Sequence, residues 1–209
     1  SRNGEQLAFN QKSENEKDFS LRKYIKTSGF SSILGFVKYP AKDKSGFYYE
    51  EEFLPKDGAE LYLNEILSGK NGFEFIETAV DGEVVSQSII QLPRKGEDVI
   101  LSLDAGIQSE FYKIIKNLAG SVGFQGGAGV IMDVNSGEIL AIASFPEYDS
   151  EVMTEGEDVT KIEGYYRDTT NPFLNRIISG LYAPGSIVKP FLAFAALEEE
   201  VISPEKEII

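Results

Sequence analysis

The sequence lacks two residue types that carry much of enzyme chemistry: it contains no cysteine and no histidine. Without cysteine, the chain cannot form a disulfide, use a thiolate nucleophile or bind a metal through sulfur. Without histidine, a metal site would need carboxylates alone, and no EF-hand loop is present in the sequence. We therefore expect neither a metal nor another cofactor, and any nucleophilic serine must be activated by a group other than imidazole.

Basic residues and long apolar runs are also scarce. Lysine and arginine number 20 against 34 aspartates and glutamates, which gives a formal net charge of −14. Phosphate backbones are bound by basic faces, so nucleic acid is not an expected partner. No apolar run approaches the length of a membrane span. Hydrophobic residues make up 42% of the 209 residues, which is typical of a globular chain with one large or two small domains.

The most informative motif is S-x-x-K at Ser186 and Lys189. Pro184 and Gly185 predict a turn before it, and the apolar spacing after it predicts a helix with Pro190 in the first turn. Residues i and i+3 share a helical face, so Lys189 can reach the Ser186 hydroxyl and take its proton. The backbone N–H of Ser186, at the helix start, would help hold a developing oxyanion.

Two features keep other interpretations open. The tetrapeptide also occurs at Ser20 with Lys23, in a charged stretch, and at Ser203 with Lys206, in a polar tail. A serine at the start of a helix can also act simply as an N-cap, so Ser186 has a purely structural alternative.

A lysine acts as a base only when its amine is neutral, and burial favours the neutral form. We expect Val188, Phe191 and their neighbours to bury the amine of Lys189.

Several segments, in order along the chain, resemble the class B penicillin-binding proteins, which are monofunctional D,D-transpeptidases that cross-link peptidoglycan. These segments are residues 2–8 (RNGEQLA), 57–72 (DGAELYLN and LSGKNG), 100–108 (ILSLD and IQ), 129–146 (GVIMD, SGEILA and SFP) and 171–186 (NPFLNR and GLYAPGS). The sequence departs from the family pattern at Ser1, where an acid is usual, at Ala183, where a proline is common, and at Ile187, where threonine is usual. None of these departures removes a group that the chemistry needs. The sequence of residues 171–176 (NPFLNR) favours the cell-elongation branch of the family.

The resemblance implies an α+β fold. Residues 1–95 would form a strand-rich, elongated pedestal of the dimerisation type. Residues 96–209 would form the N-terminal portion of a penicillin-recognising α/β sandwich, truncated after the S-x-x-K helix.

The resemblance also implies a function for the parent protein. Ser186 would be the acylated nucleophile of a peptidoglycan D,D-transpeptidase, Lys189 its general base, and the Ser186 N–H half of an oxyanion hole. The substrate would be the D-Ala-D-Ala end of a stem peptide, and β-lactam antibiotics would acylate the same serine. The pedestal would contact a membrane glycan polymerase and other cell-wall synthesis proteins. The protein would work at the extracytoplasmic face of the bacterial membrane, anchored by an N-terminal segment that this chain does not contain.

The family also needs S-x-N and K-[ST]-G elements downstream of the nucleophile. Residues 13–15 (SEN) and 44–46 (KSG) imitate them but lie upstream, and we interpret both as coincidence. We therefore expect the 209-residue chain to be inactive by itself.

Three alternatives remain: a β-lactamase or β-lactam sensor of the same superfamily, a non-catalytic pedestal module that binds a glycan polymerase, and a bifunctional class A relative. A polar and aromatic stretch at residues 48–52 is either a solvated edge or part of a partner surface.

Sequence patterns predict the secondary structure in outline. We expect a helix over 58–67, a hairpin of 73–80 and 83–90, a strand over 98–103, a helix from an Asp104 N-cap to Gly120, a hairpin of 128–133 and 138–145, and an irregular acidic loop over 147–170. The helix after Asp104 carries an apolar stripe that we expect to be core: Ile107, Phe111, Ile114, Ile115 and Leu118. Asp133 and Glu138 flank a turn and are not expected to be a catalytic carboxylate pair.

Overall fold

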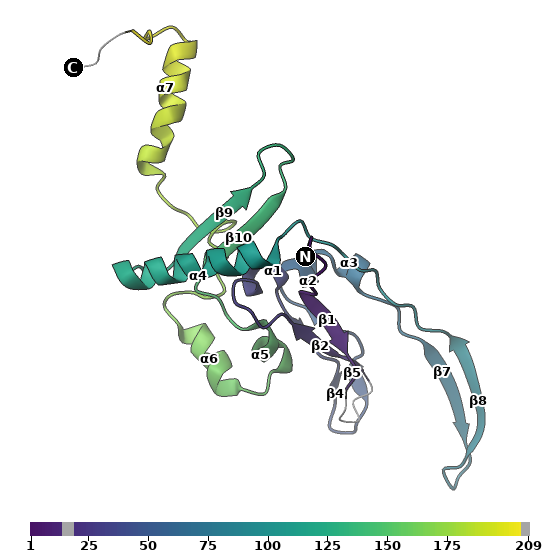
Figure 1. Ribbon diagram of the computed structural model, residues 1–209. Coiled ribbons are helices and arrows are strands. Elements are labelled where there is room, and N and C mark those ends of the chain that lie inside the picture. The colour runs from purple at the N-terminus through teal and green to yellow at the C-terminus, as the bar shows by residue number, and fades with distance from the viewer. Residues whose placement is uncertain (14–18, 206–209) are drawn as a thin grey trace. The chain divides into compact units, whose positions relative to one another are not determined.

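The structure is a computed structural model that describes residues 1–13 and 19–205. The chain divides into two compact units, Ser1–Ser179 and Gly180–Ile209, each described by itself below. Figure 1 labels most helices and strands of the two units.

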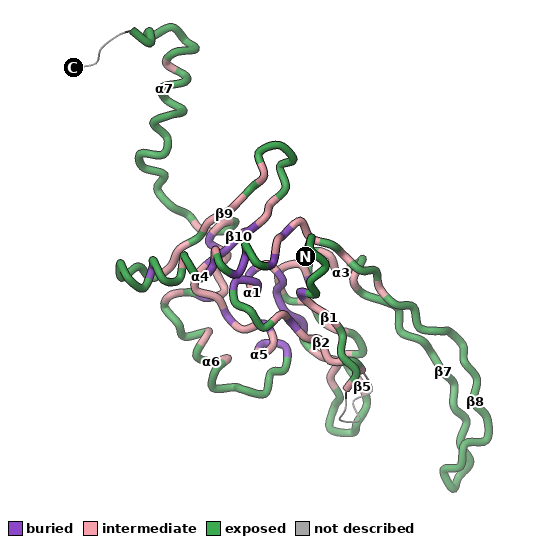
Figure 2. Tube along the Cα trace, viewed as in Figure 1, coloured by how far each residue is buried: buried purple, intermediate pink, exposed green. Residues whose placement is uncertain are grey.

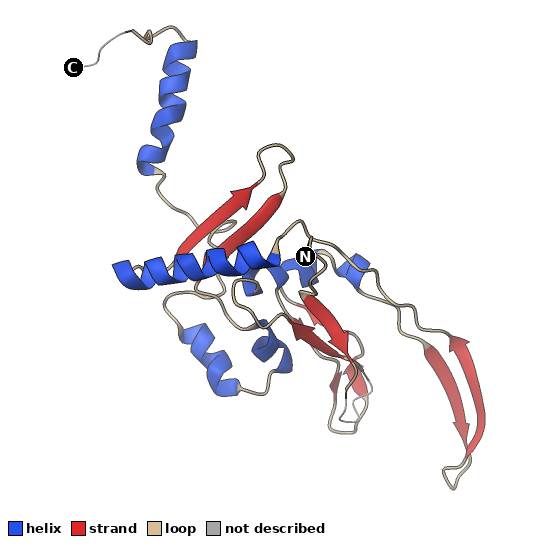
Figure 3. Ribbon diagram, in the orientation of Figure 1, coloured by secondary structure: helices blue, strands red, loops and turns tan. Residues whose placement is uncertain are grey.

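Every sheet among the described residues is a two-stranded antiparallel pair, and all of them lie in the first unit (Figure 3). The pairs are β1 (Ala8–Gln11) with β2 (Leu21–Tyr24), β3 (Val37–Lys38) with β6 (Leu54–Pro55), β4 (Ala41–Lys42) with β5 (Tyr48–Glu50), β7 (Phe73–Thr78) with β8 (Val84–Gln91), and β9 (Gly127–Met132) with β10 (Ile139–Phe145).

The first unit holds six helices within its described residues: α1 (Ser31–Leu34), α2 (Gly58–Tyr62), α3 (Asn64–Leu67), α4 (Ala105–Val122), α5 (Ser150–Glu155) and α6 (Val159–Arg167). The second unit holds a short 3₁₀ helix, η1 (Gly185–Val188), which leads directly into α7 (Lys189–Glu198).

The hydrophobic core of the first unit is made of residues distant in sequence. Its buried members are Leu7, Tyr24, Phe30, Leu34, Phe36, Ala105, Tyr148 and Met153. The buried segments gather around α1, α5, β2 and β10, whereas β7 and β8 are exposed throughout (Figure 2). The N-terminal residues therefore pack with residues from beyond position 100 in one core.

Two polar side chains, one buried and one half-buried, fix the loop before α1. The amide nitrogen of Gln108, on α4, donates to the carbonyls of Gly29 and Ile142, and its oxygen accepts from the Ile142 N–H at 2.7 Å. The carboxylate of Glu147 accepts from the N–H groups of Gly29 at 2.6 Å and Ser31 at 3.0 Å, and burial raises the pKa of Glu147. Gln108 thus ties α4 to β10 at a position that the apolar pattern of the helix does not indicate.

The start of α4 is confirmed, but its buried face is not the predicted one. The Asp104 carboxylate accepts from the Ile107 N–H at 3.0 Å and caps the helix. The helix continues past Gly120 to Val122, where Gly123 ends it in the left-handed conformation at φ 82°. Its buried residues are Ala105, Gln108, Ser109, Tyr112 and Ala119. Within the predicted stripe, Phe111 and Ile115 are half-buried, and Ile107, Ile114 and Leu118 are exposed.

Two further predictions are wrong for local physical reasons. Residues 98–103 form no strand; they make isolated contacts, such as the Ser102 hydroxyl to the Ile139 carbonyl at 2.8 Å. The acidic stretch 147–170 is not irregular, because Asp149 and Asp158 cap α5 and α6. The same acidic composition that suggests a loop supplies the two helix caps.

The remaining elements agree with the sequence. The predicted helix over 58–67 is present as α2 and α3, which meet at Leu63. The hairpin of β7 and β8 and the hairpin of β9 and β10 are both present. At the second turn, Asp133 accepts from the N–H groups of Asn135 and Ser136, which lowers the pKa of Asp133 and confirms its role in the turn.

Candidate active site

Ser186 and Lys189 lie on one helical turn in the second unit. Ser186 is inside η1, and the backbone N–H of Lys189 donates to the Ser186 carbonyl. In a 3₁₀ helix the side chains at i and i+3 lie directly above one another, so this turn aligns the hydroxyl-bearing and amine-bearing side chains on one side. Gly185 permits the turn because its φ of +57° lies in the left-handed region, which favours glycine.

The N-cap interpretation of Ser186 is wrong. The residue that precedes η1 is Pro184, and the residue that precedes α7 is Val188. Neither helix start receives a hydrogen bond from a capping side chain. The Ser186 hydroxyl therefore does not cap a helix. The backbone N–H of Ser186 lies at the start of η1, where the leading N–H groups lack an intrahelical acceptor.

The expected burial of Lys189 is absent from its own unit. Lys189 is exposed, Val188 is 37% exposed and Phe191 is 76% exposed. The physical reason is that α7 is a single helix, and a lone helix cannot shield side chains that project from its own surface. Its apolar residues are nonetheless spread around the helix, a distribution found where a helix is enclosed on all sides.

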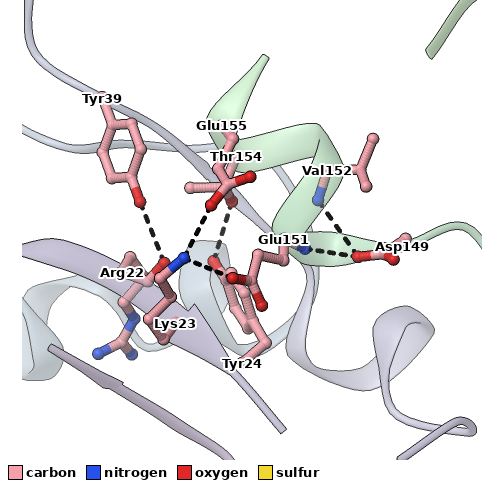
Figure 4. Close-up of polar contacts among 9 residues, drawn as sticks. All are labelled: Arg22, Lys23, Tyr24, Tyr39, Asp149, Glu151, Val152, Thr154 and Glu155. Carbon is pink, nitrogen blue, oxygen red and sulfur yellow. Dashed lines mark hydrogen bonds and ion pairs between the residues drawn. The ribbon is translucent and has the colours of Figure 1, made fainter. Parts of the chain in front are cut away.

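The copy of the motif at Ser20 and Lys23 is in a different environment. The Lys23 amine, on β2, donates to Glu151 at 2.5 Å and to Glu155 at 2.7 Å, both on α5 (Figure 4). These carboxylates raise the pKa of Lys23 above its usual range. An amine held as a cation cannot accept a proton from serine, so this copy is excluded as a catalytic pair.

The same region holds further polar contacts between β2 and its neighbours. Arg22 forms an ion pair with Glu60 at 2.7 Å, with both side chains largely buried. The Thr154 hydroxyl on α5 donates to the Tyr24 hydroxyl at 3.4 Å, and the Tyr39 hydroxyl donates to the Arg22 carbonyl at 3.1 Å (Figure 4). The cations of β2 thus serve to join β2 to α2 and α5.

The structure describes only some of the other sequences that resemble active-site motifs. Residues 44–46 (KSG) lie in the turn between β4 and β5, where Asp43 accepts from the N–H groups of Ser45 and Phe47. They are therefore part of a hairpin loop and not of a catalytic strand. Lys206, and residues 14 and 15 of the SEN sequence, lie outside the described residues.

The segment that leads to the motif is held by Arg176, a residue to which the sequence analysis assigned no role. Its buried guanidinium donates to the carbonyls of Thr170, Asn171 and Leu174. Its backbone N–H donates to the Ser144 hydroxyl at 3.1 Å. One sequence signal could have indicated this anchor: a single arginine stands near the apolar residues Leu174 and 177–178.

Asn175 continues this anchor. Its amide nitrogen donates to the Ser32 carbonyl at 3.3 Å, and its oxygen accepts from the N–H groups of Ile177 and Ile178. Phe173 packs against Tyr148, with ring centroids 4.8 Å apart. The NPFLNR sequence therefore fastens the end of the first unit, a few residues before the turn that carries Ser186.

No helix within residues 1–13 or 19–205 is long and apolar enough to cross a lipid bilayer.

Comparison with known proteins identifies both halves of the chain. Residues 15–101 match the family model of the penicillin-binding protein dimerisation domain, and residues 127–209 match that of the penicillin-binding protein transpeptidase domain.

The chain is similar to the peptidoglycan D,D-transpeptidases MrdA of Haemophilus influenzae (strain ATCC 51907 / DSM 11121 / KW20 / Rd) and Escherichia coli (strain K12). It is 30% identical to the first over 201 residues and 31% identical to the second over 196 residues, which is 92% and 90% of this chain. It spans about 30% of the length of each of these curated relatives.

Among solved structures, the chain resembles penicillin-binding protein PBP2 of Helicobacter pylori in its complex with MreC. The TM-score is 0.70 at 29% identity, and the match covers 91% of this chain and 35% of that one. The matched structure and the mixed helices and strands agree with the predicted α+β, penicillin-recognising fold. The chain therefore belongs to the class B penicillin-binding proteins, with residues from both the dimerisation and the transpeptidase domain.

Proposed function

We propose that this chain is part of a peptidoglycan D,D-transpeptidase whose nucleophile is Ser186. The observation that carries the proposal is the η1 turn, which places Ser186 and Lys189 at i and i+3 inside the residues that match the transpeptidase domain. The relatives named peptidoglycan D,D-transpeptidases support the same reaction.

In this proposal, Lys189 accepts the Ser186 hydroxyl proton while Oγ attacks the carbonyl of the penultimate D-alanine. The resulting oxyanion is held in part by the Ser186 N–H. Collapse of the intermediate breaks the peptide bond, and the terminal D-alanine leaves as an amine that takes up the proton. An amine of a second stem peptide then attacks the acyl-serine ester, which forms the cross-link and releases Ser186. A β-lactam follows the first half of this path and remains as the ester.

Lys189 can act as a base only if its amine becomes neutral, and burial is the usual cause. The second unit by itself leaves Lys189 exposed. We therefore propose that contacts beyond this unit enclose the amine in the working enzyme, and that residues 1–209 alone do not turn over substrate. Release of D-alanine from a D-Ala-D-Ala peptide by the 209-residue chain would contradict the second statement.

The proposal extends to partners and location. The relatives named MrdA and the spelling of residues 171–176 support the cell-elongation branch. In this proposal the pedestal binds other cell-wall synthesis proteins, a membrane glycan polymerase among them, and the complex of a solved relative with MreC supports a partner of the first kind. In this proposal the enzyme works on the extracytoplasmic side of the bacterial membrane, held there by an N-terminal anchor.

The proposal is tested on the full-length protein with a fluorescent penicillin and with a D-Ala-D-Ala stem peptide. We expect a stable fluorescent adduct and release of D-alanine, both lost in Ser186→Ala. Rapid turnover of the penicillin would instead indicate a β-lactamase. Failure of Ser186→Ala to remove the adduct would exclude Ser186 as the nucleophile.

A further inference from the structure

Arg176 precedes Ser186 by ten residues, and it is a buried cation. In the described part of the chain, its guanidinium donates only to backbone carbonyls: those of Thr170, of Asn171 at 3.2 Å and of Leu174 at 3.4 Å. Burial of a cation costs free energy, which is offset when several acceptors are bonded at once. The planar fork of arginine can bond several carbonyls in a fixed geometry. These contacts point to a side chain that shapes this loop.

The same arginine is packed against the hairpin of β9 and β10. A Cβ at Gly126, just before β9, would lie 2.5 Å from the Nε of Arg176 and 2.8 Å from the Phe145 carbonyl oxygen, so a larger residue would not fit there. On β10, the Ser144 hydroxyl accepts from the Arg176 N–H at 3.1 Å and donates to the Leu174 carbonyl at 3.1 Å. We call Arg176 with these contacts the arginine anchor. It holds the chain through both its side chain and its backbone.

The chain remains hydrogen-bonded from the arginine anchor to the end of the first unit. The Asn175 side-chain oxygen accepts from the N–H groups of residues 177–178 at 3.2 and 3.4 Å. The Ser179 N–H donates to the Asn175 carbonyl at 2.8 Å and closes a turn. Six residues, 180–185, then connect this turn to Ser186. A chain advances by at most about 3.6 Å per residue, so the held turn limits how far from it Ser186 can lie.

We propose that Arg176 is a positioning residue for the acylation of Ser186. The arginine anchor fixes the place from which the connecting segment 180–185 leaves the first unit, and it thereby raises the fraction of molecules in which the Ser186 Oγ reaches the acyl carbonyl. Arg176 neither touches the substrate nor transfers a proton. A displacement of about 1 Å, caused by a change far from the chemistry, can lower a rate by roughly 10²-fold. The inference rests on the proposed function, because it takes Ser186 as the nucleophile.

The test measures acylation of the full-length protein at increasing concentrations of a fluorescent penicillin, which separates the binding constant from the saturating rate. All rates are expressed per folded protein. Arg176→Met should lower the saturating rate roughly 10- to 100-fold and leave the binding constant unchanged. Arg176→Lys keeps the charge without the planar fork, so it should recover only part of the rate. The pH profile of the rate should be that of the wild type in both variants, because geometry and not charge is altered at the site.

A matched control removes another largely buried arginine of the first unit. Arg22 forms an ion pair with Glu60 on α2, outside the arginine anchor. Arg22→Met should lower the stability against urea, because it leaves a buried carboxylate unpaired, but its folded protein should be acylated at the wild-type rate. This variant separates a general loss of stability from a loss of position.

A second kind of variant lengthens the connection and leaves every bond of the arginine anchor in place. Insertion of two glycines between Gly180 and Leu181 should also lower the saturating rate. Combined with Arg176→Met, the insertion should cost little more than the stronger of the two single changes, because both loosen the same connection.

Three results would overturn the inference. The first is a wild-type saturating rate in folded Arg176→Met. The second is a wild-type rate in Arg176→Lys or a shifted pH profile in Arg176→Met, either of which would make the charge of the arginine the important property. The third is full multiplication of the two losses in the combined variant, which would make them independent. The milder Arg176→Lys decides the matter if Arg176→Met does not fold.

Failure of the proposed function gives a different pattern. An adduct that persists in Ser186→Ala would remove both the nucleophile and the inference built on it. An adduct that is lost in Ser186→Ala but forms at the normal rate in Arg176→Met would overturn the positioning role alone.

Discussion

The S-x-x-K sequence occurs in two described regions of the chain with opposite environments. At Lys23 the amine joins β2 to α5 through Glu151 and Glu155 and is held as a cation. At Lys189 the amine belongs to the turn that carries Ser186, and the residue is exposed. The comparison teaches that the partners of the lysine, and not the spacing of the tetrapeptide, decide whether the motif can carry chemistry.

The largest expected difference between the two copies is in acylation. In the full-length protein, Ser186→Ala should lower the rate of acylation by a fluorescent penicillin by 10³-fold or more, an order of magnitude typical for loss of a nucleophile. Ser20→Ala should leave the rate unchanged, because its lysine cannot accept a proton. In-gel fluorescence against time measures both rates. A normal rate in Ser186→Ala would remove the distinction altogether.

Replacing Lys189 should also slow acylation more than replacing Lys23, but by a smaller factor than the one expected for the two serines. Lys189→Met should slow acylation by roughly 10²- to 10⁴-fold, which is the usual contribution of a general base. Lys23→Met should acylate at the wild-type rate, provided that folded protein is compared. The two rates can be obtained by stopped-flow quenching of protein fluorescence. Equal slowing in both variants would show that Lys189 has no special role.

For folding stability we expect the opposite order: replacing Lys23 should cost more than replacing Lys189. Lys23→Met leaves Glu151 and Glu155 without their shared cation, and we expect a loss of about 1–2 kcal/mol after allowance for partial exposure. The exposed Lys189 should contribute less than about 0.5 kcal/mol to the stability of residues 1–209. Urea unfolding of the two variants measures this. A stable Lys23→Met protein would mean that the β2–α5 ion pairs contribute little.

The smallest expected effect is a dependence on alkaline pH. The pKa of Lys23 is raised in the folded state, so its ion pairs stabilise the protein fully below the unfolded lysine pKa of about 10.4. That contribution is lost as the pH rises from there through the raised folded value. The stability difference between the wild type and Lys23→Met should therefore be constant from about pH 7 to 9 and shrink above about pH 10.4. A difference that already shrinks near pH 8 would contradict the raised pKa.

Local signals in the sequence predicted much of the fold. Asp104 before an apolar period marked the start of α4, and Asp81 with Gly82 marked the turn of the β7–β8 hairpin. The buried face of α4 was not predictable in this way, because Gln108 is buried through its bonds to Gly29 and Ile142, which come from elsewhere in the chain. Periodicity reports the hydrophobic side of a helix and not its polar contacts.

The candidate site was also predictable only in part, because local signals predict a turn but not distant contacts. The turn at Pro184 and Gly185 is a local feature, and it puts Ser186 and Lys189 on one helical turn. The role of Lys23 depends on partners far away in sequence, Glu151 and Glu155. The guanidinium of Arg176 bonds nearby carbonyls, but its backbone N–H donates to the distant Ser144 hydroxyl. A tetrapeptide pattern contains no information about such partners, so only the structure separates the Lys23 copy from the Lys189 copy.

The most direct test of this account is peptide mapping by mass spectrometry of the full-length protein after reaction with a fluorescent penicillin. The account predicts one adduct, on the peptide that contains Ser186, and none on the peptides that contain Ser20 or Ser203. An adduct on either of those peptides, with the Ser186 peptide unmodified, would contradict it.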